Sequence, residues 1–191
     1  MAATQPTTPR VRFNTLLMDA KVMEAGGNLS TAVQKLLAAH RTAQEDPQLL
    51  AEVGAQTMND VGRVYLMLGR LDSAQHILEN IDFFNTADTA LNRKFNMAHH
   101  RENLGKLWEM KGDLGKAKEF RERKVTDIIC SNYHCPMLRI EHFRATPMII
   151  CRTCQSIYYC GRVCQAEDYP RHILYCRNTL AQLESPPVAY S

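Results

Sequence analysis

The sequence predicts a mainly α-helical protein in which about six helices form antiparallel hairpins and a small cysteine-rich module follows them. Two observations lead to this fold class. A helical pattern recurs three times before residue 127, and all seven cysteines lie at or after position 130. The chain has 191 residues, 45% of them hydrophobic and 23% charged, which is ordinary for a globular protein of one domain or two small ones.

The repeat emerges when residues 59–77 are compared with residues 102–120, which lie 43 positions later. Each copy has a small residue, a large apolar residue one turn later, a glycine, and then a second small residue. This order fits a helix hairpin, because small residues let the second helix approach and glycine readily adopts the left-handed conformation that ends a helix. The four positions are Gly62, Tyr65, Gly69 and Ala74, then Gly105, Trp108, Gly112 and Ala117, and in a weaker first copy Ala20, Met23, Gly27 and Ala32.

Two further signals place helix boundaries in this region. Asp46-Pro47 predicts an N-cap followed by proline at the first helical position, and residues 85–88 (NTAD) offer a cap before the fifth helix. The arrangement over residues 10–126 resembles the tetratricopeptide repeat (TPR), with a longer period than the usual 34 or so residues. This resemblance implies stacked hairpins with a surface for a protein partner; an unrelated six-helix bundle is the alternative.

The last third of the chain contains eight potential metal ligands: Cys130, Cys135, Cys151, Cys154, Cys160, Cys164, His172 and Cys176. Eight ligands suffice for two tetrahedral zinc sites, and every cysteine is then used once. Cys151 and Cys154 can reach one ion from a tight turn. His172 and Cys176 share one face of a helix, for which Pro170 suits the first position.

Other uses of the cysteines fit less well. A disulfide framework would leave one of seven cysteines unpaired, and a redox Cys-x2-Cys centre calls for a βαβ context that Cys151 lacks. Neither a signal peptide nor a transmembrane segment is expected, so we expect an intracellular protein, cytoplasmic or nuclear, in a compartment where disulfides are rare.

The spacing Cys-x2-Cys-x5-Cys-x3-Cys-x7-His-x3-Cys over residues 151–176 resembles that of the MYND zinc finger. Gln165, Asp168-Tyr169 and Pro170-Arg171 extend the likeness beyond the ligands. The first pair departs from it, being Cys-x4-Cys where x2 is commoner, and a long gap precedes Cys151. By this resemblance one structural Zn²⁺ is held by Cys130, Cys135, Cys160 and Cys164, and a second by Cys151, Cys154, His172 and Cys176.

The resemblances together divide the chain into a disordered tail at 1–9, a TPR-like helical domain at 10–126, a MYND finger at 127–178 and a C-terminal tail at 179–191. Sites with four protein ligands leave no open coordination position, and the sequence shows no phosphate-binding loop or catalytic triad, so we expect a non-enzyme.

The MYND resemblance implies a protein–protein interaction adaptor that binds short proline-rich peptides, with Gln165, Tyr169 and Arg152 as candidate contacts. The alternative for Tyr169 is that it packs in the core of the finger. A different functional class is a ubiquitin-ligase-like cofactor that uses the cross-braced finger. A net charge of +3 is too small to predict a nucleic-acid partner, and no membrane partner is expected.

Overall fold

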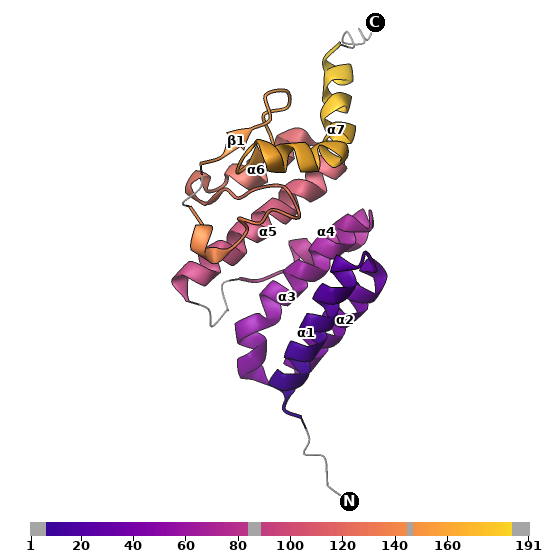
Figure 1. The fold of residues 1–191 in the computed structure, drawn as a ribbon, viewed down its shortest axis with the longest axis vertical. Coiled ribbons are helices and arrows are strands. Elements are labelled where there is room, and N and C mark those ends of the chain that lie inside the picture. The colour runs from indigo at the N-terminus through magenta and orange to yellow at the C-terminus, as the bar shows by residue number, and fades with distance from the viewer. Residues whose placement is uncertain (1–6, 84–88, 145–146, 185–191) are drawn as a thin grey trace, which may run out of the picture. The chain divides into compact units, whose positions relative to one another are not determined.

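The computed structural model describes residues 7–83, 89–144 and 147–184. Within these residues the protein is mainly helical, with seven α-helices and one short β-hairpin (Figure 1). The cap predicted at residues 85–88 lies outside the described residues. None of the described helices has the length and apolar character needed to span a lipid bilayer.

The chain divides into two compact units, Met1–Met97 and Ala98–Ser191. The division falls within helix α5, whereas the sequence predicted a domain boundary at residues 126 and 127. That predicted boundary lies inside the second unit. The physical reason is a set of buried polar contacts between α5, α6 and the cysteine-rich residues.

The first unit contains four helices, each packed against the next along the chain. Thr8 caps the first helix by accepting a hydrogen bond from the amide of Val11. As predicted, Asp46 caps the third helix, where its carboxylate accepts hydrogen bonds from two backbone amides and Pro47 occupies the first position. The helices are α1 (Pro9–Ala25), α2 (Leu29–Ala43), α3 (Pro47–Met67) and α4 (Leu71–Glu79).

The three glycines expected to end the first helix of each hairpin all adopt a left-handed backbone conformation. Gly27, Gly69 and Gly112 have φ of 76°, 70° and 85°. Each turn also has the same two hydrogen bonds; in the second, the amide of Arg70 donates to the carbonyl of Tyr65 and that of Gly69 to Leu66. These bonds pair carbonyl groups that the end of a helix otherwise leaves free. The prediction of a left-handed glycine after the first helix of each copy is confirmed at all three turns.

The small residues of the repeat lie where two helices approach closely. A Cβ atom added to Gly62 would lie 2.5 Å from Cδ2 of Leu78, and one added to Gly105 would lie 2.8 Å from Cγ of Arg121. Leu78 and Arg121 occupy equivalent positions in their copies, 16 residues after the glycine. The second unit therefore places a buried arginine where the first unit places a buried leucine.

The second unit joins the end of α5 to the cysteine-rich segment. Helices α5 (Ala90–Met110) and α6 (Leu114–Glu122) come first, followed by two short 3₁₀ turns (Val125–Asp127 and Ile140–His142). The strands β1 (Ile149–Ile150) and β2 (Tyr158–Tyr159) pair antiparallel, with Ile149 opposite Tyr159. The last helix is α7 (Arg162–Glu184).

Helix α7 differs from the prediction at its N-terminal end. It begins at Arg162, so Pro170 lies inside the helix and the prediction of Pro170 at its first position was wrong. The helix changes direction along its length (Figure 1), as an internal proline leads one to expect. It also continues to Glu184, beyond the predicted end of the finger at residue 178. Its early start has a reason in the sequence: buried residues recur every fourth position, at Cys164, Asp168, His172 and Cys176.

Candidate metal centres and the adjacent groove

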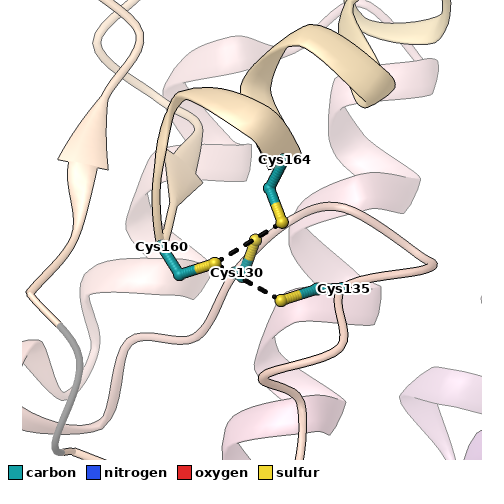
Figure 2. A group of neighbouring side chains, drawn as sticks. All are labelled: Cys130, Cys135, Cys160 and Cys164. Atoms are coloured by element: carbon teal, nitrogen blue, oxygen red, sulfur yellow. Dashed lines mark hydrogen bonds between the residues drawn. The ribbon is translucent and has the colours of Figure 1, made fainter.

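The first candidate metal centre consists of four cysteine side chains that point toward one another (Figure 2). Cys130 and Cys135 come from the segment between the two 3₁₀ turns, Cys160 directly follows β2, and Cys164 lies in the first turn of α7. All four sulfur atoms lie within 4.8 Å of one another. The sulfur of Cys160 is 3.4 Å from that of Cys135 and 3.5 Å from that of Cys164.

The second candidate centre combines three cysteines with a histidine. Cys151 follows β1, Cys154 lies in the turn after it, and His172 and Cys176 lie on α7. Nε2 of His172 is 3.4 Å from the sulfur of Cys151 and 3.6 Å from that of Cys154. The sulfurs of Cys151 and Cys176 are 4.0 Å apart.

These distances match what a tetrahedral zinc ion requires. Zn–S bonds of about 2.3 Å place two tetrahedral sulfur ligands about 3.8 Å apart, and a sulfur and a nitrogen ligand about 3.6 Å apart. The observed separations lie on both sides of these values, and thiolate with imidazole is a donor set that suits zinc. Each cluster can therefore hold one zinc ion. The two clusters have the same members as the two quartets that the MYND resemblance implies.

The environment of the thiols also fits a cation at these positions. Burial raises the pKa of Cys130, Cys135 and Cys160 to about 12, so these thiols need a positive charge to become thiolates at neutral pH. A zinc ion supplies that charge. In the second cluster burial alone would raise the pKa of Cys151, but hydrogen bonds, first of all from the backbone of Cys154, lower it to about 7.

The histidine ligand candidate is held by a residue that the sequence reasoning missed. Nδ1 of His172 lies 3.0 Å from Oε1 of Glu109, which is fully buried on α5, 63 residues earlier in the chain. Burial alone would raise the pKa of Glu109, but the charges of Arg171 and Arg121 and the hydrogen bond with His172 hold it well below its usual range. Glu109 is therefore a buried carboxylate that stays ionised.

Glu109 belongs to a buried ion network across the second unit. Arg121 on α6 donates to both oxygens of Glu102 at 2.9 and 3.1 Å, to Glu109 at 2.9 Å, and to the carbonyl of Ser156 at 3.1 Å. Arg171 on α7 donates to Glu109 at 2.9 Å and to Asp168 at 2.7 Å. The network connects α5 and α6 with the turn after Cys154 and with α7.

The repeat contained a signal for this network. Forty-three positions earlier, Glu109 corresponds to Leu66 and Arg121 to Leu78, and both leucines are fully buried. An acid and a base at two core positions of the same repeat copy indicate a buried ion pair, because a single buried charge is costly.

A groove lies beside the second cluster and brings together the three predicted peptide-contact residues. Its volume is about 750 Å³, and its lining includes Cys151, His172 and Cys176 of that cluster. Tyr169 is 50% exposed, whereas Tyr158 and Tyr159 of the finger are buried, and the hydroxyl of Tyr159 donates to Asp168. Other residues that line the groove are Arg152, Gln165, Ile149, Arg162 and Ile173.

Comparison with known proteins gives one match. A family model described as the MYND finger matches residues 130–176, which is the span of the eight ligand candidates. These residues form a MYND finger, a zinc-binding domain of the protein-interaction class. The match does not reach residues 10–126, so their likeness to the TPR remains a prediction. Neither a curated protein nor a solved structure matches the chain.

Proposed function

We propose that this chain is a non-enzymatic adaptor whose MYND finger binds short proline-rich peptides, with the TPR-like helices as a second protein-binding surface. The observation that supports the peptide function is the groove, because Arg152, in the turn after β1, and Gln165 and Tyr169, on α7, line one depression. Among them, Tyr169 is a half-exposed aromatic side chain that shares the lining of the groove with apolar Ile149 and Ile173.

The chemistry of the groove suits an extended proline-rich segment. Aromatic side chains pack against proline rings, and grooves lined by aromatic residues recognise the preformed extended conformation of such peptides. Proline lacks an amide hydrogen, so the peptide presents mainly carbonyl acceptors. Gln165 and Arg152 supply amide and guanidinium donors for these carbonyls.

The proposed role of zinc is structural. Two ions, one in each cluster, would connect the β-hairpin and the segment of Cys130 to α7, and α7 contributes Gln165 and Tyr169 to the groove. Four protein ligands leave no coordination position for a substrate. Elemental analysis should therefore find two zinc ions per chain.

The first unit supports a second binding surface. A depression of about 610 Å³ is lined by residues of α2, α3 and α4 and by residues 80–82 that follow α4. Apolar side chains, including Leu50, Met58 and Ile77, line much of it. A TPR-like array of helix hairpins would use a surface of this kind for a protein partner.

Peptide binding tests the main proposal. Fluorescence anisotropy would measure the affinity of a labelled Pro-x-Leu-x-Pro peptide for the full chain. Tyr169→Ala should weaken binding about tenfold or more, as truncation of an aromatic anchor usually does. Leu174→Ala is the matched control, because Leu174 is a 63% exposed apolar residue on the same helix that does not line the groove. Equal losses in both variants, or no binding by the unmodified chain, would contradict the proposal.

The interleaved order of the ligand pairs supports one alternative function. Cys130 and Cys135 join Cys160 and Cys164 across the Cys151–Cys154 pair, an order that cross-braced ubiquitin-ligase fingers also use. A reconstituted ubiquitination assay separates the two functions. Ubiquitin transfer that depends on this chain would favour the ligase-like cofactor, whereas peptide binding without transfer would favour the adaptor.

A further inference from the structure

The orientation of the His172 ring depends on its two nitrogen atoms. Nε2 lies within 3.6 Å of the sulfurs of Cys151 and Cys154, and Nδ1 lies 3.0 Å from Glu109. A carboxylate accepts hydrogen bonds, so the proton of the neutral imidazole resides on Nδ1. The lone pair of Nε2 then points toward the three sulfurs, as a zinc ligand requires.

The carboxylate of Glu109 is itself held in place. It is fully buried and accepts hydrogen bonds from Arg121 and Arg171, each at 2.9 Å. Arg121 also donates to the carbonyl of Ser156, and the hydroxyl of Ser156 donates to the carbonyl of Cys154. The second cluster has two halves, the turn after Cys154 and the helix of His172. Arg121 on α6 contacts the first half, and Glu109 on α5 contacts the second.

We infer that Glu109, which lies outside the MYND segment 130–176, is a positioning residue for the second zinc site. It selects the tautomer of His172 and fixes the orientation of its ring. The metal-binding unit of this chain therefore extends from α5 to α7, and the finger alone lacks one of the groups on which its zinc affinity depends.

A buried control residue makes this inference testable. Glu102 is a carboxylate on the same helix, buried to a similar extent and paired with the same Arg121, but its ion-pair partners are Arg121 and Lys106 and not His172. Glu109→Gln and Glu102→Gln each remove one buried negative charge next to Arg121. Only the first change alters the partner of His172.

The experiment measures zinc affinity of the full chain by competition with a chromophoric chelator. Glu109→Gln should weaken the second site about 10- to 100-fold, the usual effect of mutating the carboxylate partner of a metal-binding histidine, because the amide is a neutral and weaker acceptor at Nδ1, and Glu102→Gln less than about threefold. Cobalt(II) spectra distinguish the two sites, because a four-thiolate site and a site with three thiolates and an imidazole absorb differently. If Glu109→Gln does not fold, Glu109→Asp keeps the charge and shortens the side chain, and it should also weaken the second site.

A double-mutant cycle completes the test. In a His172→Cys background the fourth ligand is a thiolate, which has no ring nitrogen for Glu109 to orient. Glu109→Gln should therefore change zinc affinity less than about threefold in that background. Persistence of the full effect in that background would overturn the inference, and so would equal losses from Glu109→Gln and Glu102→Gln.

A second inference, which rests on the proposed peptide function, concerns the charge of the peptide. Arg152 and Arg162 both line the groove and both are exposed. No ion pair joins either of them to another described residue, whereas Arg121 and Arg171 in the same unit are paired with carboxylates. Among the described residues that line the groove there is no aspartate or glutamate.

We infer that the groove takes proline-rich peptides that carry an acidic residue beside the proline motif. Three peptides with one common core and flanking glutamate, glutamine or lysine test this charge preference. The glutamate peptide should bind about fivefold tighter than the glutamine peptide at low salt, the size expected for one or two exposed ion pairs, and the lysine peptide should bind most weakly.

Variants of the arginines complete this test. Arg152→Gln combined with Arg162→Gln should abolish the preference, and Arg139→Gln, an exposed arginine outside the groove, should leave it unchanged. Equal affinity for the glutamate and glutamine peptides would overturn this inference and leave the proposed peptide function standing. Absence of binding by all three peptides would overturn both.

Discussion

Arg121 is the residue whose replacement should destabilise the second unit most directly. It is 1% exposed and donates hydrogen bonds to Glu102, Glu109 and the carbonyl of Ser156. Arg121→Met keeps most of the apolar volume and removes the charge. The two glutamates then remain buried with fewer partners, a change that usually costs about 3–5 kcal/mol.

The remaining partners of the two glutamates refine this magnitude. Glu102 keeps Lys106 at 3.2 Å, and Glu109 keeps Arg171 at 2.9 Å and His172 at 3.0 Å. Neither carboxylate is left without a positive neighbour. We therefore expect a loss near the lower end of the range, about 3 kcal/mol in the free energy of unfolding.

The assay is urea unfolding at saturating zinc, followed by tryptophan fluorescence. The only tryptophan of the sequence, Trp108, lies on α5 in the second unit, so the signal reports on that unit. Arg123→Met is the matched control on α6, because Arg123 pairs with Glu119 at an exposed site where the expected loss is under about 1 kcal/mol. A loss for Arg121→Met no larger than that of the control would refute the reasoning.

Three further predictions concern metal removal, packing and pH. Chelation of zinc should increase hydrogen exchange in α5 and α6 as well as in residues 130–176 and leave α1–α4 protected; an increase confined to 130–176 would contradict the coupling through the ion network. Gly62→Ala should cost about 1–3 kcal/mol in calorimetry, because the new methyl group would lie 2.5 Å from Leu78, and an unchanged melting temperature would contradict that close approach. Burial and the charges of Arg101 and Arg123 lower the pKa of His100 to about 4. When the pH falls below about 6.5, the ordinary pKa of histidine, His100 takes up a proton in the unfolded chain but not in the folded chain. The free energy of unfolding should therefore fall by about 1 kcal/mol between pH 7.5 and pH 5.5 because of His100. In urea titrations at saturating zinc, the His100→Gln variant should lose about 1 kcal/mol less over this pH range than the unmodified chain. Equal losses would show that His100 does not cause the pH dependence.

Predictions that depend on local chemistry agreed with the structure. The turns at Gly27, Gly69 and Gly112 followed from the conformational freedom of glycine at a helix end, which requires no knowledge of distant residues. The cap at Asp46 followed in the same way. The ligand candidates followed from residue type and spacing, because seven cysteines and a histidine at such short intervals are typical of zinc sites.

The start of the helix that contains His172 could not be predicted correctly from local preference alone. Pro170 suggested a helix start, but the fourfold spacing of Cys164, Asp168, His172 and Cys176 places all four side chains on one buried face. The structure keeps that face continuous and accepts a proline inside the helix. Burial of three metal-ligand candidates and of Asp168, which accepts hydrogen bonds from Tyr159 and Arg171, outweighed the local preference of proline.

The sequence by itself determined the hairpin turns and the set of eight ligand candidates, because those features depend on neighbouring residues. Only the tertiary structure decided that Glu109 contacts His172, that Arg121 contacts Ser156, and that α6 and the part of α5 from Ala98 onward belong with the finger. A glutamate or an arginine in a helical pattern ordinarily predicts an exposed residue, since buried charges are rare without partners. The partners here are distant in sequence, and folding alone brings them within hydrogen-bonding distance.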